Sequence, residues 1–232
     1  SLSFGIATSL GNPNHQGVAM ALKRAGVDVA WRENQAGCKG VCDRVPTEEL
    51  TGASKAPYFS HNENHDEILV EGLTQRIGAL DRDTVIVEHM MGSHGPAYWK
   101  RVPERFEVFK PVCEHSQFSR CENAAIVNAY DNSLVYTDYV LSRFVETLKA
   151  GDAQGIDTAL IFMSDHGESL GERNMFLHGM PYAIAPEAQR HVPAVIWMSE
   201  GFRASRTIEL ACMKAKAAAP ISHDNLFHSV LG

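Results

Sequence analysis

The sequence lacks the features of a membrane-spanning or nucleic-acid-binding chain. Its apolar runs, such as residues 192–198, fall far short of the roughly 20 residues that cross a bilayer, and no basic-then-apolar signal pattern opens the chain. Lys and Arg number 21 against 28 Asp and Glu, giving a net charge of -7 over 232 residues. A basic stripe for a phosphate backbone is therefore not expected, and we predict a soluble chain without a nucleic-acid partner.

Cysteine is scarce, and its spacing matches no structural zinc site. The five cysteines form two close pairs and a single residue, at Cys38 and Cys42, Cys113 and Cys121, and Cys212. Disulfides within the pairs are favoured over reduced thiols, which points to the periplasm or the cell exterior. Cys212 lies in a helix-like segment, residues 208–217, where we expect a buried small apolar residue.

Helical and strand patterns alternate along the chain, without repeats or low-complexity segments. Helices are expected over residues 15–25, 66–77, 122–149 and 224–231, and strands over 27–31, 84–87, 158–163 and 192–198. This alternation predicts an α/β fold with a mostly parallel central sheet and helices on both faces, as a single domain over residues 1–232.

Histidine and carboxylate side chains follow two of these strands. Asp165 and His166 come directly after the strand at 158–163, and His94 stands in a second histidine-glycine loop beyond the strand at 84–87. Each pattern alone fits a solvated turn, but two such strand ends make coincidence less convincing. Because strand ends form the ligand crevices of α/β sheets, the residues favour a metal site suited to zinc.

Other histidines have weaker claims. The polar segment 51–65 reads as a loop, in which His61 and His65 are expected to be solvated rather than metal ligands. His89, His191 and His223 are expected to be structural.

Four longer motifs carry a family resemblance. They are Met-Gly-Ser-His-Gly-Pro-Ala-Tyr (91–98), Asn-Ala-Tyr-Asp-Asn-Ser-Leu-Val-Tyr-Thr-Asp (128–138), Ser-Asp-His-Gly-Glu-Ser-Leu-Gly (164–171) and Leu-His-Gly-Met-Pro (177–181). In this order, and with the Cys113 to Cys121 spacing, they closely resemble the periplasmic catalytic domain of lipid A phosphoethanolamine transferases, the group that includes the mobile colistin-resistance enzymes. The resemblance implies an alkaline-phosphatase/sulfatase-like α/β sandwich with Zn2+ at the strand ends.

The resemblance also implies roles for individual residues. Thr8, in Gly-Ile-Ala-Thr-Ser-Leu (5–10), matches the nucleophile and would bind zinc together with Asp165 and His166. His94 and His178 match positions that contact the phosphoryl group, protonate the leaving alcohol or hold a second zinc.

Two further positions follow from the same resemblance. Lys39 matches a lysine that faces the substrate, where its charge would offset that of phosphate. Glu168 would act behind the metal ligands by orienting His166.

The activity so implied is transfer of phosphoethanolamine from phosphatidylethanolamine to a lipid A phosphate through a covalent threonine intermediate. The product would carry less negative charge and would bind polymyxins such as colistin less well. We expect a monomer at the periplasmic face of the bacterial inner membrane, anchored by N-terminal membrane helices that this sequence does not include.

Some features depart from the family pattern. The strand that carries a zinc-binding glutamate has no counterpart, and the cysteine pair flanking the threonine is absent. Three alternatives therefore stay open: transfer to another glycan acceptor, an inactive domain that binds lipid head groups, and a hydrolase or sulfatase. The last is ranked lowest because the sulfatase modification motif is absent.

Overall fold

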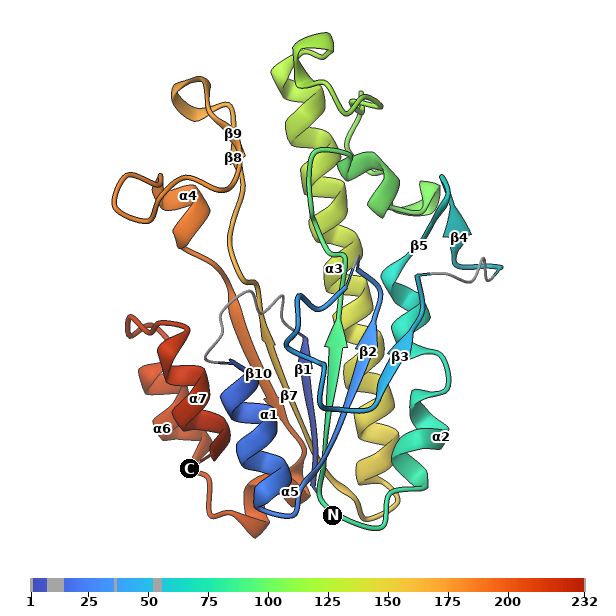
Figure 1. Ribbon diagram of the computed structural model, residues 1–232, viewed down its shortest axis with the longest axis vertical. Coiled ribbons are helices and arrows are strands. Elements are labelled where there is room, and N and C mark those ends of the chain that lie inside the picture. The colour runs from blue at the N-terminus through green and yellow to red at the C-terminus, as the bar shows by residue number, and fades with distance from the viewer. Residues whose placement is uncertain (1, 8–14, 36, 52–55, 232) are drawn as a thin grey trace.

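A six-stranded sheet forms the centre of the computed structural model, which describes residues 2–7, 15–35, 37–51 and 56–231. The strand order is β10-β7-β1-β6-β2-β3, and only β10 runs antiparallel to its neighbour (Figure 1). The strands are β1 (Leu2–Ala7), β2 (Asp28–Glu33), β3 (Thr47–Glu49), β6 (Thr84–His89), β7 (Asp157–Met163) and β10 (Ala194–Met198). The predicted mostly parallel sheet is confirmed.

Helices cover both faces of this sheet, also as predicted. On one face α2 (Leu73–Gly78) and the long α3 (Asn123–Asp152) pack against Ile86 and Leu160. On the other face α1 (His15–Arg24) and α7 (Asp224–Leu231) lie side by side in front of the strands (Figure 1). Successive β6 side chains alternate between the two apolar clusters because strand side chains point to opposite faces.

Shorter elements surround this framework. They are β4 (Phe59–Ser60), β5 (Glu63–Asn64), β8 (Ser169–Leu170), β9 (Phe176–Leu177), α4 (Glu187–Arg190), α5 (Glu200–Ser205), α6 (Leu210–Lys216) and the 3-10 helices η1 (Asp66–Val70), η2 (Tyr98–Arg101), η3 (Glu104–Phe106), η4 (Phe118–Arg120) and η5 (Glu172–Asn174). Among the described residues, no helix combines the length and apolar character needed to cross a membrane.

Three local predictions were wrong. The helix expected over residues 66–77 is divided into η1 and α2 at Gly72, whose φ of 72° is left-handed and ends the first helical turn. The segment expected as a loop before it contains the β4–β5 hairpin, and His65 is buried there with its Nε2 3.0 Å from Oγ of Ser60. Cys212 is exposed rather than buried, and no residue of α6 is buried.

The start of the chain forms a strand of the central sheet. The first three residues of the nucleophile segment expected over residues 5–10 belong to β1, which pairs in parallel with β6 and β7. Pairing on both sides satisfies the backbone groups of this segment, which favours a central strand over a loop. Thr8 lies outside the described residues.

Candidate active site

A cavity of about 330 Å³ opens at the carboxyl ends of β6 and β7. The loop after β6 and residues 162–168 line it, together with one face of α3 and the segment between α4 and β10. Because parallel strands end at one edge of the sheet, the two histidine loops separated by more than 70 residues meet there.

Three histidines form a row beside this cavity. The rings of His166 and His178 stack with centroids 3.7 Å apart, and His94 meets His178 edge-on at 5.6 Å. Asp165 extends the row, since its Oδ2 lies 3.3 Å from Nε2 of His166. The structure thus brings together the four residues that the motifs singled out as metal ligands or proton-transfer groups.

Glu168 holds this row from the protein interior. Its side chain is 4% exposed, and Oε1 accepts a hydrogen bond from Nδ1 of His178 at 2.9 Å. We expected Glu168 to orient His166. The β8–β9 hairpin instead places His178 opposite Glu168, because Glu168 precedes β8 and His178 follows β9. The ligand atoms of His166, Glu168 and His178 nevertheless lie within 4.8 Å of one another.

The second carboxylate oxygen of Glu168 and the hydroxyl of Tyr98 are both buried, without a hydrogen-bond partner among the described residues. Burial, reinforced by the negative charge of Glu168, raises the pKa of Tyr98. The tyrosine hydroxyl is therefore neutral across the physiological pH range. In the sequence Tyr98 is only the last residue of the motif at 91–98, and nothing there predicted its place beside Glu168.

Close backbone packing shapes the loop that carries Asp165 and His166. Gly167 donates its N–H to the carbonyl oxygen of Gln189 at 3.1 Å, and a Cβ at this position would lie 2.0 Å from the carbonyl oxygen of Ala188. Only glycine permits this approach to α4. His223, which we expected to be structural, donates from Nε2 to the carbonyl oxygen of Ser164 at 2.8 Å, so it contacts the same loop.

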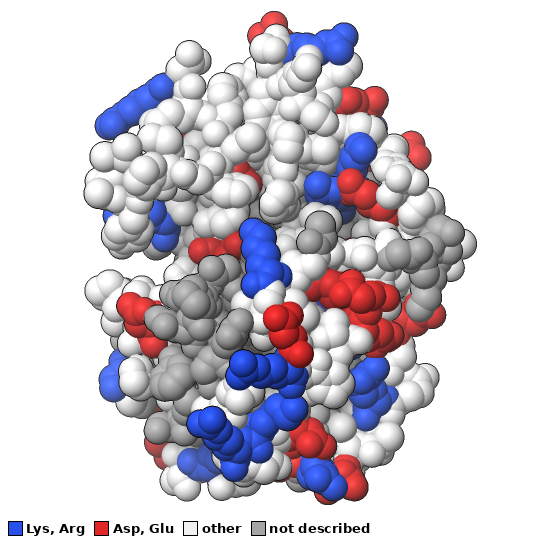
Figure 2. All heavy atoms as spheres, in the orientation of Figure 1, with Lys and Arg blue, Asp and Glu red and all other residues white. Residues whose placement is uncertain are grey.

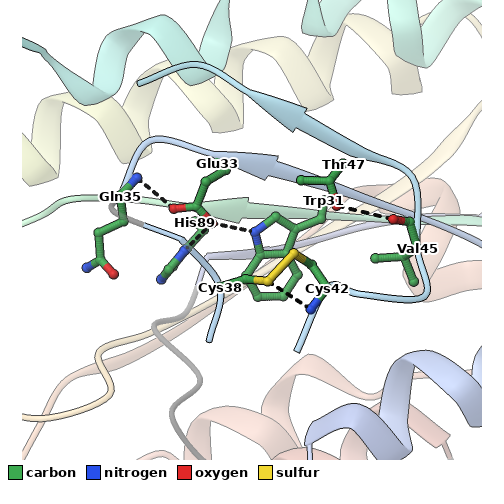
Figure 3. Close-up of a disulfide and its surroundings, with 8 residues drawn as sticks. All are labelled: Trp31, Glu33, Gln35, Cys38, Cys42, Val45, Thr47 and His89. Atoms are coloured by element: carbon green, nitrogen blue, oxygen red, sulfur yellow. Dashed lines mark hydrogen bonds and ion pairs between the residues drawn. A yellow bond between two sulfur atoms is a disulfide. The ribbon is translucent and has the colours of Figure 1, made fainter. Parts of the chain in front are cut away.

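A buried polar network joins the ends of β2 and β6. Glu33 is fully buried and accepts hydrogen bonds from Nε1 of Trp31 at 2.8 Å, Nδ1 of His89 at 2.7 Å and the N–H of Gln35 at 2.7 Å (Figure 3). His89 is thus structural, as expected. Gln35, at the end of this network, lines the cavity, and no sequence signal marked it.

Lys39 lies apart from the residues that line the cavity. It is exposed, has a φ of 48° and sits between the cysteines of the Cys38–Cys42 disulfide, which Figure 3 shows in front of Trp31. The Cys113–Cys121 disulfide is also present, so both predicted disulfides are confirmed. His191, which we expected to be structural, also lines the cavity. Its side chain is 82% exposed, so it does not have the buried structural role that we expected.

Charges are mixed on the face shown in Figure 2. Acidic and basic side chains lie next to one another in the lower half of this view, whereas much of the upper half is uncharged.

Comparisons with known proteins agree with the fold and the motifs. The Sulfatase family model matches residues 4–232. Phosphoethanolamine transferase EptA of Escherichia coli (strain K12) is 41% identical over 220 residues, which make up 94% of this chain and 40% of that protein. The chain therefore spans about two fifths of the length of this curated relative.

Two solved structures are similar over most of the chain. The soluble domain of lipooligosaccharide phosphoethanolamine transferase A from Neisseria meningitidis is 40% identical with a TM-score of 0.86, covering 90% of this chain and 63% of that one. The C-terminal periplasmic domain of phosphoethanolamine transferase EptC from Campylobacter jejuni is 31% identical with a TM-score of 0.81, covering 100% of this chain and 87% of that one. The chain belongs to the Sulfatase family, with the alkaline-phosphatase/sulfatase-like fold seen in phosphoethanolamine transferase domains.

Proposed function

We propose that this chain is the catalytic domain of an enzyme that transfers phosphoethanolamine from phosphatidylethanolamine to a lipid A phosphate. The observation that carries the proposal is the row of Asp165, His166, His178 and His94 at the cavity, on a fold shared with EptA-type transferases. Such a row combines anionic oxygen with imidazole nitrogen, which suits phosphoryl transfer assisted by a metal ion and by proton exchange.

The donor set fits zinc. Carboxylate oxygen and imidazole nitrogen are ordinary zinc ligands, and Asp165 and His166 present both beside one another. A buried Glu168 oxygen without a partner among the described residues adds an uncompensated acceptor at the same place. We assign Asp165 and His166 as zinc ligands together with Thr8. When bound there, zinc would lower the pKa of the threonine hydroxyl and offset phosphate charge.

The residues of the chain divide the remaining work. The Thr8 hydroxyl gives up its proton to solvent as its oxygen forms a bond to the donor phosphorus. The bond from phosphorus to the diacylglycerol oxygen breaks, and His178 or His94 supplies the proton that this leaving oxygen needs. A lipid A phosphate oxygen then attacks the same phosphorus, the bond to Thr8 breaks, and the threonine oxygen takes up a proton again. Glu168 orients His178 for proton transfer through Nε2, because its Nδ1 is already engaged. Lys39, which is exposed and is not among the residues that line the cavity, would offset the charge of substrate phosphate that extends beyond the cavity.

The biological setting follows from this chemistry. Masking a lipid A phosphate lowers its negative charge, so polymyxins including colistin would bind less well. The two disulfides fit an oxidising compartment, and the similar EptC domain is periplasmic, which supports a place at the periplasmic face of the inner membrane. We expect a monomeric domain held there by a membrane anchor.

Mass spectrometry tests the proposal directly. The chain is incubated with zinc and phosphatidylethanolamine, and its intact mass and peptide map are compared with those of Thr8→Ala. A phosphoethanolamine adduct that maps to Thr8 and disappears on adding lipid A supports the proposal. If only another glycan removes the phosphoethanolamine from Thr8, that glycan is the acceptor in place of lipid A. If the zinc-loaded chain forms no adduct, the result would indicate a domain that binds lipid head groups without catalysis.

Metal content is measured on the same samples. Asp165→Asn and His166→Ala should each lower zinc affinity by about tenfold or more, because each removes a ligand. His115→Ala, at an exposed loop histidine between the cysteines of the second disulfide, is the matched control and should retain zinc. Unchanged zinc affinity in both ligand variants would show that the metal site lies elsewhere.

A further inference from the structure

Asp66, at the start of η1, lies behind the cavity and accepts three hydrogen bonds. It is 4% exposed. Oδ1 accepts from the N–H of Met91 and from Nδ2 of Asn34, both at 2.8 Å, and Oδ2 accepts from the N–H of Gly92 at 2.7 Å. Hydrogen bonds to a carboxylate of this length are among the stronger ones in proteins. Asp66 therefore holds Met91 and Gly92, the second and third residues after β6, in the loop that carries His94.

Residues 93–95 of that loop are held from α3, η2 and the segment before β8. Oγ of Ser133 in α3 donates to Oγ of Ser93 at 2.8 Å, and Nε of Arg101 in η2 donates to the carbonyl oxygen of His94 at 3.1 Å. The N–H of Gly95 lies 3.4 Å from Oε1 of Glu168. Every residue from 91 to 95 thus has a contact outside its own loop, and Asp66 supplies the contacts nearest the strand.

Asn34 links the same carboxylate to the other side of the cavity. Its N–H donates to the carbonyl oxygen of His89 at 3.0 Å, and its side-chain amide reaches both Asp66 and the carbonyl oxygen of Asn64. The next residue, Gln35, lines the cavity. Displacing Asp66 would therefore move together the cavity residues that follow β2 and β6.

We propose that Asp66 is a positioning residue that sets the place of His94 at the cavity, an inference that rests on the proposed transferase function. Asp66 does not line the cavity. It acts through the backbone of Met91 and Gly92, so its loss should lower kcat more than it changes KM. Small displacements of a reacting group reduce rate steeply while substrate binding is spread over many contacts.

Asp66→Asn tests the inference because it replaces one acceptor oxygen with a donor that opposes the loop N–H groups. We expect amide hydrogen exchange at Met91 and Gly92 to accelerate about tenfold or more, with exchange in α3 unchanged. We expect kcat to fall about 10- to 100-fold and KM to change less than about twofold. Wild-type kcat in Asp66→Asn, or accelerated exchange spread over the whole sheet, would overturn the inference.

A second variant covers the case in which Asp66→Asn does not fold. Gly92 has a φ of 54°, and a Cβ there would meet no atom within 4 Å, so Gly92→Ala strains the loop without a collision. Gly26→Ala is the matched control, since Gly26 has a φ of 84° and equal space in the turn after α1, away from the cavity. Both variants should lose a similar amount of stability, because alanine is unfavourable at a left-handed φ. Only Gly92→Ala should lose kcat, and equal kcat in the two variants would contradict the inference.

The activity of the wild-type chain distinguishes failure of the proposed function from failure of the positioning role. No transfer by zinc-loaded wild type would remove the function itself, whereas wild-type transfer with undiminished activity of Asp66→Asn would remove only the positioning role. The exchange measurement requires no substrate and reports on the loop in either case.

Discussion

Glu168 and His178 face each other across a two-stranded hairpin and are joined by a hydrogen bond of 2.9 Å. Glu168 directly precedes β8 and His178 directly follows β9, and the two strands pair Ser169 with Leu177. The antiparallel register therefore places the carboxylate opposite the imidazole. A short hairpin outside the main sheet thus completes the row of histidines at the cavity.

This pair predicts coupled effects on activity. Glu168→Gln should reduce kcat about tenfold, because a hydrogen bond to a charged group contributes about 1.5–3 kcal/mol. His178→Ala should reduce it further, and the double variant should resemble His178→Ala alone, since Glu168 acts through the histidine. Steady-state kinetics of the four proteins form the measurement, with Glu187→Gln at an 84% exposed carboxylate as the control. Multiplicative losses in the double variant would mean that the two residues act separately.

Gly167→Ala should destabilise the fold. The added Cβ would lie 2.0 Å from the carbonyl oxygen of Ala188, a backbone atom that moves only if α4 moves. Overpacking of this kind costs about 1–3 kcal/mol or more. Urea unfolding at equilibrium measures the loss. Gly78→Ala is the contrasting variant, because its nearest atom is a side-chain oxygen of Gln154 at 3.4 Å and alanine favours the α2 helix. Equal stability of the two variants would contradict the close packing at Gly167.

Stability should fall with rising pH because of Glu88. Burial raises the pKa of this carboxyl from 4.5 to about 8, although Arg32 lies 3.3 Å away and opposes the shift. The folded chain then binds a proton that the unfolded chain has released, so the contribution is complete below about pH 4.5 and is lost as pH rises through about 8. The free energy of unfolding should decrease by up to about 1.4 kcal/mol per pH unit within this window.

Glu88→Gln should flatten this dependence, because glutamine keeps the shape of the neutral acid and does not titrate. Denaturant titrations at several pH values between 5 and 8 measure the slope. Glu146→Gln, at a carboxylate that is 59% exposed, should leave the slope as it is in wild type. A wild-type slope in Glu88→Gln would assign the pH dependence to another group.

The two disulfides should differ in their consequences. Cys113 is buried in an apolar cluster with Tyr98, and its disulfide closes a separation of eight residues, so Cys113→Ser with Cys121→Ser should lose about 2.5 kcal/mol or more. The Cys38–Cys42 disulfide closes four residues and should contribute about 2 kcal/mol. Thermal unfolding with and without reductant compares them.

The smaller disulfide should also affect substrate binding, because it encloses Lys39. Cys38→Ser with Cys42→Ser should raise KM with little change in kcat, as expected when a group that contacts the substrate phosphate becomes mobile. If KM stays at its wild-type value while Lys39→Ala also leaves it unchanged, Lys39 has no part in binding.

Much of the framework follows from local sequence. The strand at 84–89 and the helix at 123–152 were predictable because their apolar residues recur with the period of one secondary structure over a long stretch. The cysteine pairs were predictable because few residues separate their members. Asp165, His166, His94 and His178 were recognisable because each lies in a motif of several residues.

Tertiary structure alone decided how these residues are arranged. Glu168 orients His178 rather than His166 because the hairpin register sets its partner, and Asp66 reaches Met91 and Gly92 across 25 or more residues of sequence. Burial of His65 and exposure of Cys212 also depend on which faces the other elements cover. Periodicity and motifs report on neighbours along the chain, whereas hydrogen-bond partners and burial are determined by residues that only the folded sheet brings together.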